Sequence, residues 1–306
     1  MNTPTNVGTL ALLAMTLITA TACADLDGVT PQNGTSAPAD WSPPFVATWN
    51  FDEASGTRAA SGGSCSAGSD CDLTDNNTVT QDTTNFKEGV AAADFTRAND
   101  ESLSCLNATC DELIAPAGGS FTVGCFFRTD DTAGDQGLFD TLEAGATAGF
   151  AITRTTATSL MDFKIADSGG LILMTAGVDS WPLNTWTHLV GRFDNDADAM
   201  SVVVNGVQIG GTTTQDDIGA SGDPFVIGSN ETIDPSGQAD ECFYIDQALT
   251  DAQICRMCSC GIDGDNDIGN EKCLCSGADA TVYAANGRNT TQCGGCTPTA
   301  CNAVAP

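Results

Sequence analysis

The dipeptide Asn205-Gly206 places the strongest constraint on the fold, because it lies between two runs of β-branched residues. Both central residues of the tightest hairpin turns take positive φ, and Asn followed by Gly adopts this conformation readily. We therefore expect a tight turn within residues 201–209, and a further strand over 187–193 before it. A hairpin embedded in a long series of short β segments is typical of an antiparallel sandwich.

Short apolar segments separated by turn residues recur along the chain, with almost no helical periodicity. Strands of this kind fit two antiparallel sheets packed face to face, and this all-β sandwich is the predicted fold class. The predicted strands cover residues 45–51, 102–106, 121–129, 137–142, 150–155, 161–166, 171–176, 187–193, 201–209, 225–228 and 242–245.

The chain is strongly acidic, with 10 Lys and Arg against 40 Asp and Glu and a formal net charge of −30. A surface of this sign repels phosphate groups, so neither nucleic acid nor an anionic membrane is an expected partner. Solubility in a salty medium explains the charge, and so does recruitment of calcium or of a cationic partner. The composition leaves both interpretations open.

The first residues have the pattern of an export signal. Residues 10–18 form an apolar core too short to span a membrane, and small residues follow at 20–22, although no Lys or Arg precedes the core. The 15 cysteines also indicate an oxidising compartment. We expect a signal peptide over 1–22 and a protein that is extracellular or held at the outer cell surface.

Cys23 begins the exported chain if cleavage follows residue 22. There it is similar to the lipidated cysteine of bacterial lipoproteins, which predicts a lipid anchor, whereas cleavage after Ala24 would remove it. Residues 23–44 are rich in Asp, Pro, Thr, Gly and Ser and are predicted to form a flexible tether. A sandwich domain over 45–254 and a small cysteine-rich segment over 255–306 follow.

Apart from Cys23, the cysteines divide into two even sets, which suits two units with their own disulfide bonds. Short separations within the first set predict bonds inside single loops, between Cys65 and Cys71 and between Cys105 and Cys110. The CxxC spacings of the second set would suit zinc in a cytosolic protein, but in an exported chain they predict disulfides. The predicted disulfide cysteines are Cys65, Cys71, Cys105, Cys110, Cys125 and Cys242 in the sandwich, and Cys255, Cys258, Cys260, Cys273, Cys275, Cys293, Cys296 and Cys301 in the tail.

Four motifs, in this order, resemble the LamG-like jelly rolls of the concanavalin A-like lectin/glucanase superfamily. They are VATWNFDEASG at 46–56, FTVGCFF at 121–127, WTHLV at 186–190 followed by VVVNGV at 202–207, and DECFYIDQALTDAQI at 240–254. The resemblance implies a jelly roll over about 45–254, with a short helix that starts after Thr250 and ends near Ile254. It also implies that the strands holding Cys125 and Cys242 are neighbours joined by a disulfide.

Domains that resemble this family usually bind carbohydrate or protein, and only some branches are enzymes. The glucanases carry E-x-D-x-E on one strand, so that their carboxylates face the same side. This pattern does not occur here, and no nucleophile pattern accompanies the single histidine, His188, which lies where the family carries a structural histidine. We predict a non-catalytic module that binds a glycan or an extracellular protein. A structural or adhesive surface component and a divergent glycoside hydrolase remain alternatives.

Two groups of carboxylates are candidate calcium ligands. One lies in the tail, where an EF-hand loop would need Gly and Glu at the places of Ile268 and Leu274, so an acidic loop between disulfides is the alternative. The other is implied by the family resemblance at the sandwich rim, where solvation of an edge strand is the alternative. The tail candidates are Asp263, Asp265 and Asp267, and the rim candidates are Asp52, Glu53, Asp240 and Glu241.

Aromatic side chains that stack on sugars are scarce. Trp41, Trp181 and Tyr283 are candidates, and Trp181 is the predicted platform because it precedes Pro182 in a loop. Trp49 and Trp186 lie in the family motifs and are predicted to be buried. The oligomeric state is not predicted.

Overall fold

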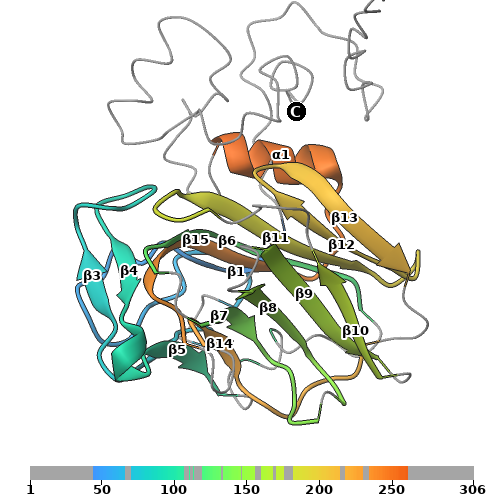
Figure 1. Ribbon diagram of the computed structural model, residues 1–306, viewed down its shortest axis with the longest axis horizontal. Helices are drawn as coiled ribbons and strands as arrows, with labels where there is room; N and C mark the ends of the chain where they lie inside the picture. Colours follow the sequence, from blue (N-terminus) through green and yellow to red (C-terminus); the bar gives the residue numbers. More distant parts are fainter. Residues whose placement is uncertain are drawn as a thin grey trace, which may run out of the picture.

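The computed structural model describes residues 44–65, 70–106, 110, 113, 119–131, 134–145, 147–155, 160–167, 170–175, 182–213, 218–229 and 234–260. Within them the chain forms two antiparallel β-sheets that pack face to face, with α1 on the outside (Figure 1). The predicted all-β jelly-roll sandwich is confirmed. None of the described helices is long and apolar enough to cross a membrane.

The first sheet has eight strands in the order β13-β12-β11-β6-β15-β4-β3, and β1 also pairs with β15. Strand β15 is central, because it pairs with β6 along one edge and with both β4 and β1 along the other. The strands are β1 (Phe45–Trp49), β3 (Thr80–Asp82), β4 (Ala92–Phe95), β6 (Phe121–Thr129), β11 (Thr187–Asp194), β12 (Ala199–Val204), β13 (Val207–Thr213) and β15 (Gly237–Ile245).

The second sheet has seven strands in the order β10-β9-β8-β7-β14-β5-β2. All of its pairings are antiparallel. The strands are β2 (Thr74–Asn76), β5 (Ser102–Cys105), β7 (Gln136–Asp140), β8 (Phe150–Thr155), β9 (Leu160–Asp167), β10 (Gly170–Thr175) and β14 (Phe225–Ile227).

The predicted tight turn is confirmed between β12 and β13. Asn205 has a φ of 50° and Gly206 a φ of 77°, as a two-residue hairpin turn requires. Strands β2, β3 and β4 are absent from the sequence prediction. The first two have three residues each and are largely polar, so they lack the apolar alternation that marks a strand.

An aromatic cluster fills the space between the sheets. The ring of Phe121 lies 4.7 Å from that of Phe150, 5.8 Å from Phe193 and 5.9 Å from Tyr244, measured between centroids. Trp49 is fully buried, as predicted, and its indole N–H donates a 3.0 Å hydrogen bond to the carbonyl of Cys71. The core therefore holds the two sheets together mainly by buried aromatic surface.

Helix α1 (Asp251–Cys260) packs on the outer face of the first sheet (Figure 1). Thr250 caps it by accepting a hydrogen bond from the N–H of Gln253, as its position before the helix predicts. The helix continues past the predicted end near Ile254, because Met257 and Cys258 also bury their side chains. The apolar cluster beneath it consists of Phe45, Val190, Val203, Phe243, Ile245, Leu249, Ile254 and Met257.

Candidate functional site

The buried carboxylate of Asp240 holds the loop that leads into β4. Its Oδ2 accepts hydrogen bonds from the N–H groups of Lys87 (2.6 Å) and Glu88 (3.0 Å), and its Oδ1 accepts one from Glu241 (2.9 Å). Burial raises the pKa of the Asp240 carboxyl well above its ordinary value, and the N–H donors act in the opposite direction. Both oxygens of Asp240 thus have partners within the fold.

Asp52 holds the other half of the same loop. Its Oδ1 accepts hydrogen bonds from the N–H groups of Val90 (2.7 Å) and Ala91 (3.0 Å). Gly89 lies between the residues bound by Asp240 and those bound by Asp52. It has a φ of 67°, and a Cβ at this position would lie 2.5 Å from the Asp52 carboxylate. The backbone can therefore approach Asp52 this closely only with glycine at position 89.

The remaining two rim candidates have different surroundings. Glu53 accepts a 3.0 Å hydrogen bond from the N–H of Ala59, on the opposite side of the 52–59 turn. Glu241 is buried, takes a φ of 50° and lies at an irregularity in the pairing of β15 with β6. The structure thus brings Asp52 and Asp240 together around one loop, without Glu53. Among the described residues no group of three or more Asp, Glu, His or Cys is arranged to hold a metal ion. Calcium stays a prediction.

His188 is fully buried on the outer side of the first sheet. Its ring lies 4.6 Å from the ring of Phe126 and 6.1 Å from that of Phe243, and neither ring nitrogen has a hydrogen-bond partner. Burial, assisted by the nearby positive charge of Lys87, lowers the pKa of His188 to about 3. The imidazole is therefore a neutral packing group at physiological pH.

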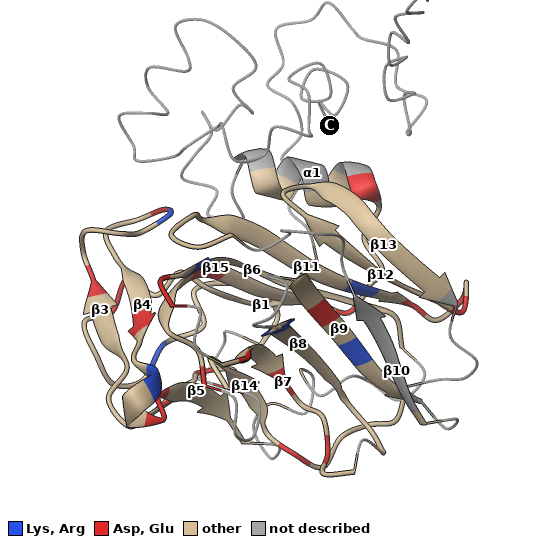
Figure 2. Cartoon of the chain, viewed as in Figure 1, with Lys and Arg blue, Asp and Glu red and all other residues tan. Residues whose placement is uncertain are grey.

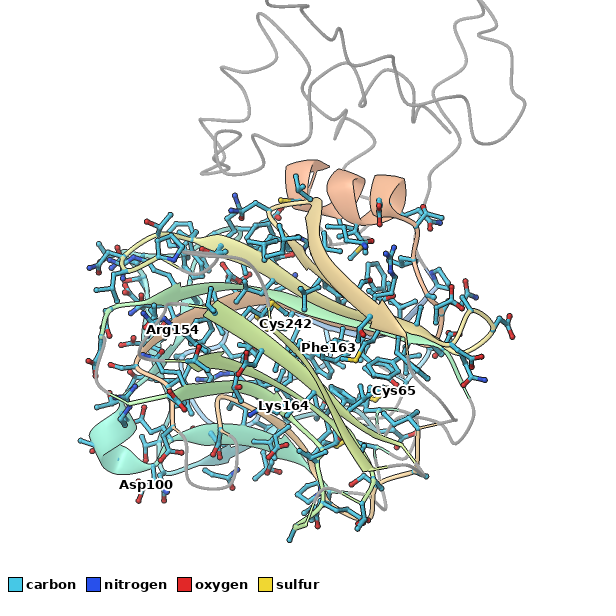
Figure 3. All side chains as sticks on the ribbon, turned by 45° about the vertical axis from the view of Figure 1, so that its right-hand side comes forward. Cys65, Asp100, Arg154, Phe163, Lys164 and Cys242 are labelled. Atoms are coloured by element: carbon cyan, nitrogen blue, oxygen red, sulfur yellow. A yellow bond between two sulfur atoms is a disulfide. The ribbon has the colours of Figure 1, made fainter. Side chains whose placement is uncertain are left out.

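Three disulfides cross-link the sandwich: Cys65–Cys71, Cys105–Cys110 and Cys125–Cys242. The first two close single loops, and the third joins the central strands β6 and β15 (Figure 3). Cys258 of α1 is also disulfide-bonded, and its side chain packs with Phe126 and with Trp186, which is buried as expected.

Strands of the second sheet turn a polar face away from the core. In β9, Met161, Phe163 and Ile165 join the core cluster, so Asp162 and Lys164, which alternate with them, lie on the opposite face (Figure 3). In β8, Ile152 is in the core and Thr153 is not. The other strands alternate in the same way. Their register places one outward-facing residue from each of six strands in a single row across the sheet, which we call the outer row. It consists of Thr74, Ser104, Val226, Asp140, Ala151 and Lys164.

Hydrogen bonds order one end of this face. The Asn76 amide donates to the hydroxyl of Ser104 at 2.8 Å and to that of Ser102 at 3.3 Å. These half-buried hydroxyl and amide groups are hydrogen-bond donors and acceptors at this end of the sheet. We did not single out the outer row from the sequence. Its signal is the alternation of MDFKIA at 161–166, with apolar side chains at every second place.

Several sequence-predicted sites lie outside the described residues. They are Cys23, Trp41, Trp181, Asp263, Asp265, Asp267, Tyr283 and the tail cysteines from Cys273 to Cys301. Cys255 and Cys260 belong to α1, whose backbone is described at these positions.

Comparison with known families matches this fold to one of them. The laminin-G-type family model of the concanavalin A-like lectin/glucanases superfamily matches residues 106–255. The chain carries a LamG-like jelly-roll domain of this superfamily. The match covers three of the four motifs and both predicted partners of the β6–β15 disulfide. No curated protein matches the chain in sequence.

A solved structure of low sequence identity shares this fold, and two others are similar to it over part of the chain. The binding domain of Paraclostridial Mosquitocidal Protein 1 is 12% identical with a TM-score of 0.51, and the match covers 71% of this chain and 52% of that one. Domain 4 of the arabinanase AbnA from Geobacillus stearothermophilus, solved with arabinotriose, is 17% identical (TM-score 0.48, 70% and 98% covered). The NanB sialidase of Streptococcus pneumoniae is 18% identical (TM-score 0.42, 53% and 26% covered). The chain thus spans about a quarter of NanB and half of the mosquitocidal domain.

Proposed function

We propose that this protein is an exported, non-catalytic module that binds a glycan on the outer row of the second sheet. One observation carries the proposal: outer-face residues of six strands line up in register, four of them polar or charged, and the Asn76 amide orders the hydroxyl groups of Ser102 and Ser104 at one end. Sugars are recognised by hydrogen bonds from such groups. Carbohydrate ligands in solved relatives, such as the arabinotriose on AbnA domain 4, are consistent with this choice but belong to those proteins.

The geometry of the rim carboxylates supports a binding role over a hydrolytic one. A glycosidase needs two carboxyl groups free to act on substrate. Asp240 is buried and uses both oxygens on backbone N–H groups, and Asp52 uses Oδ1 in the same way. These residues therefore stabilise the fold.

Export, anchoring and calcium complete the proposal. The sandwich disulfides favour an oxidising compartment, in line with a signal peptide over 1–22 and a lipid on Cys23. Of the two calcium candidates we propose the tail residues Asp263, Asp265 and Asp267, because the rim carboxylates Asp52 and Asp240 already accept backbone hydrogen bonds. A lipid anchor at Cys23 would place the glycan-binding face at the cell exterior.

The test is an oligosaccharide array probed with residues 23–306, once with calcium and once with a chelator. We expect binding to at least one oligosaccharide, and at least a tenfold loss of affinity in Ser104→Arg, whose long side chain would obstruct the outer row. Ala197→Arg, in the exposed turn between β11 and β12, is the matched control and should bind like the wild type. Absence of binding, or equal binding by Ser104→Arg, contradicts the proposal. Loss of binding on chelation would show that calcium takes part.

A further inference from the structure

In the described part of the chain, two polar side chains beside the outer row have buried atoms without a hydrogen-bond partner. Thr153 of β8 and Asp162 of β9 are in register with each other, and both lie on the face turned away from the core. Asp162 is 6% exposed and Thr153 is 1% exposed. Neither the Oδ1 of Asp162 nor the Oγ1 of Thr153 has a hydrogen-bond partner. A hydroxyl and a carboxylate oxygen are thus buried side by side with unused hydrogen-bonding capacity.

Such a pair destabilises the fold unless something binds it. A buried polar group without a hydrogen-bond partner destabilises the folded state, and a charged one does so more strongly. The nearest basic residue on the same strand does not compensate, because no ion pair in the described part of the chain joins Lys164 to Asp162. Gly137, the register neighbour of Thr153 on β7, contributes no side chain.

The chemistry of the pair defines what it accepts. A carboxylate accepts hydrogen bonds but does not donate them, whereas a hydroxyl does both. Two adjacent hydroxyl groups of a sugar supply this combination, and a bond to a carboxylate is of the stronger, charge-assisted kind. A carboxylated or sulfated sugar would instead meet the carboxylate of Asp162 on a chain of net charge −30.

We propose that Asp162 and Thr153 form a subsite for neighbouring hydroxyl groups of a neutral or amino sugar, which rests on the proposed glycan-binding function. On the same face of the sheet, the Asp162–Thr153 pair is the next pair after Ala151 and Lys164 of the outer row. It would bind one sugar unit of an oligosaccharide that lies along the outer row. Because Asp162 and Thr153 are buried, the groups around them must move before a sugar can bind. We therefore expect slow association. The unpaired atoms of Asp162 and Thr153 destabilise the folded chain, and hydrogen bonds from a bound sugar would remove this destabilisation.

The experiment measures binding and thermal stability of Asp162→Asn and Thr153→Val side by side. The probes are neutral, amino-sugar and sialylated oligosaccharides on one array, followed by calorimetry with the best binder. We expect at least a tenfold loss of affinity for each variant, a wild-type preference for neutral or amino sugars, and a Tm that is unchanged or raised. A merely structural role would instead lower the Tm.

The controls are Asp196→Asn in the turn between β11 and β12 and Thr212→Val on β13, the same substitutions away from the second sheet, which should bind like the wild type. Wild-type binding that both subsite variants retain overturns the subsite and leaves the glycan-binding function intact. A fall in Tm in both variants also overturns it, because the pair would then have a partner within the fold. A wild-type chain that binds no oligosaccharide overturns function and subsite together.

Discussion

His188 shows how burial decides the chemistry of a single side chain. After burial, the charge of Lys87 is the other cause of its lowered pKa, and the Lys87 ammonium lies 4.6 Å from the centre of the Phe126 ring against which His188 packs. Protonating the imidazole would place a second positive charge in an apolar site with no acceptor for its N–H groups. The residue therefore functions as an aromatic packing group rather than a base.

His188 makes the protein sensitive to acid. Its folded pKa of about 3 lies below the value of about 6.5 expected for the unfolded chain, so between these pH values only the unfolded chain binds the proton. Stability should thus fall as the pH falls through this window, by up to about 1.4 kcal/mol per pH unit. We expect His188→Leu to remove this part of the slope. Urea unfolding at pH 7, 6, 5 and 4 measures it, and parallel stability curves for the two proteins would refute it. The chain has one His, so the difference isolates this residue.

At the scale of elements, the loop between β3 and β4 is held from both sides. Asp240 on β15 grips Lys87 and Glu88, while Asp52 after β1 grips Val90 and Ala91. Strands β1 and β4 pair with successive parts of the same edge of β15. The hydrogen bonds of Asp52 and Asp240 hold the loop beside the point where these two strands meet. The acidic pair that the sequence offers as a calcium site thus takes part in strand placement.

Removing the Asp240 carboxylate should release this loop. In Asp240→Ala three backbone N–H groups, those of Lys87, Glu88 and Glu241, lose their acceptor, which should cost roughly 3–5 kcal/mol of unfolding free energy. Hydrogen exchange at Lys87 and Glu88 should accelerate more than exchange in β8 and β9. Asp82→Ala is the matched control, because Asp82 accepts backbone N–H bonds in a more exposed turn, and about 1 kcal/mol is expected there. Equal losses in the two variants would contradict this role of Asp240.

At the scale of the whole molecule, acidic residues far outnumber basic ones. Figure 2 shows Asp and Glu spread over both sheets, and within the described ranges the ion pairs are Arg97–Asp131 and Arg192–Asp251. Most carboxylates of the described residues thus lie outside these two ion pairs. Their mutual repulsion opposes the compact state.

Salt should therefore stabilise the protein. Raising NaCl from 0.05 to 0.5 M shortens the Debye length and screens this repulsion, so we expect the Tm to rise by a few degrees. CaCl₂ and MgCl₂ at matched ionic strength separate screening from specific binding. A larger rise with calcium than with magnesium would support a calcium site, and a Tm that does not change with NaCl would contradict the screening argument.

The fold was predictable because its signals are local. Alternating side chains, the Asn205-Gly206 turn and the closely spaced cysteines of the two disulfide loops each depend on a few neighbouring residues. Strands β2 and β3 were missed since they are short and polar, and α1 was underestimated because its last turn is held by packing on the first sheet.

The sequence by itself determined an acidic, disulfide-linked antiparallel sandwich with LamG-like motifs. Only the tertiary structure decided the roles of its polar residues. Asp240 meets Lys87 across 153 positions of sequence, and Asp162 meets Thr153 only through the register of two strands. Whether a carboxylate binds backbone, metal or sugar depends on which groups folding brings within hydrogen-bonding distance. Periodicity along the chain carries no information about those distant partners.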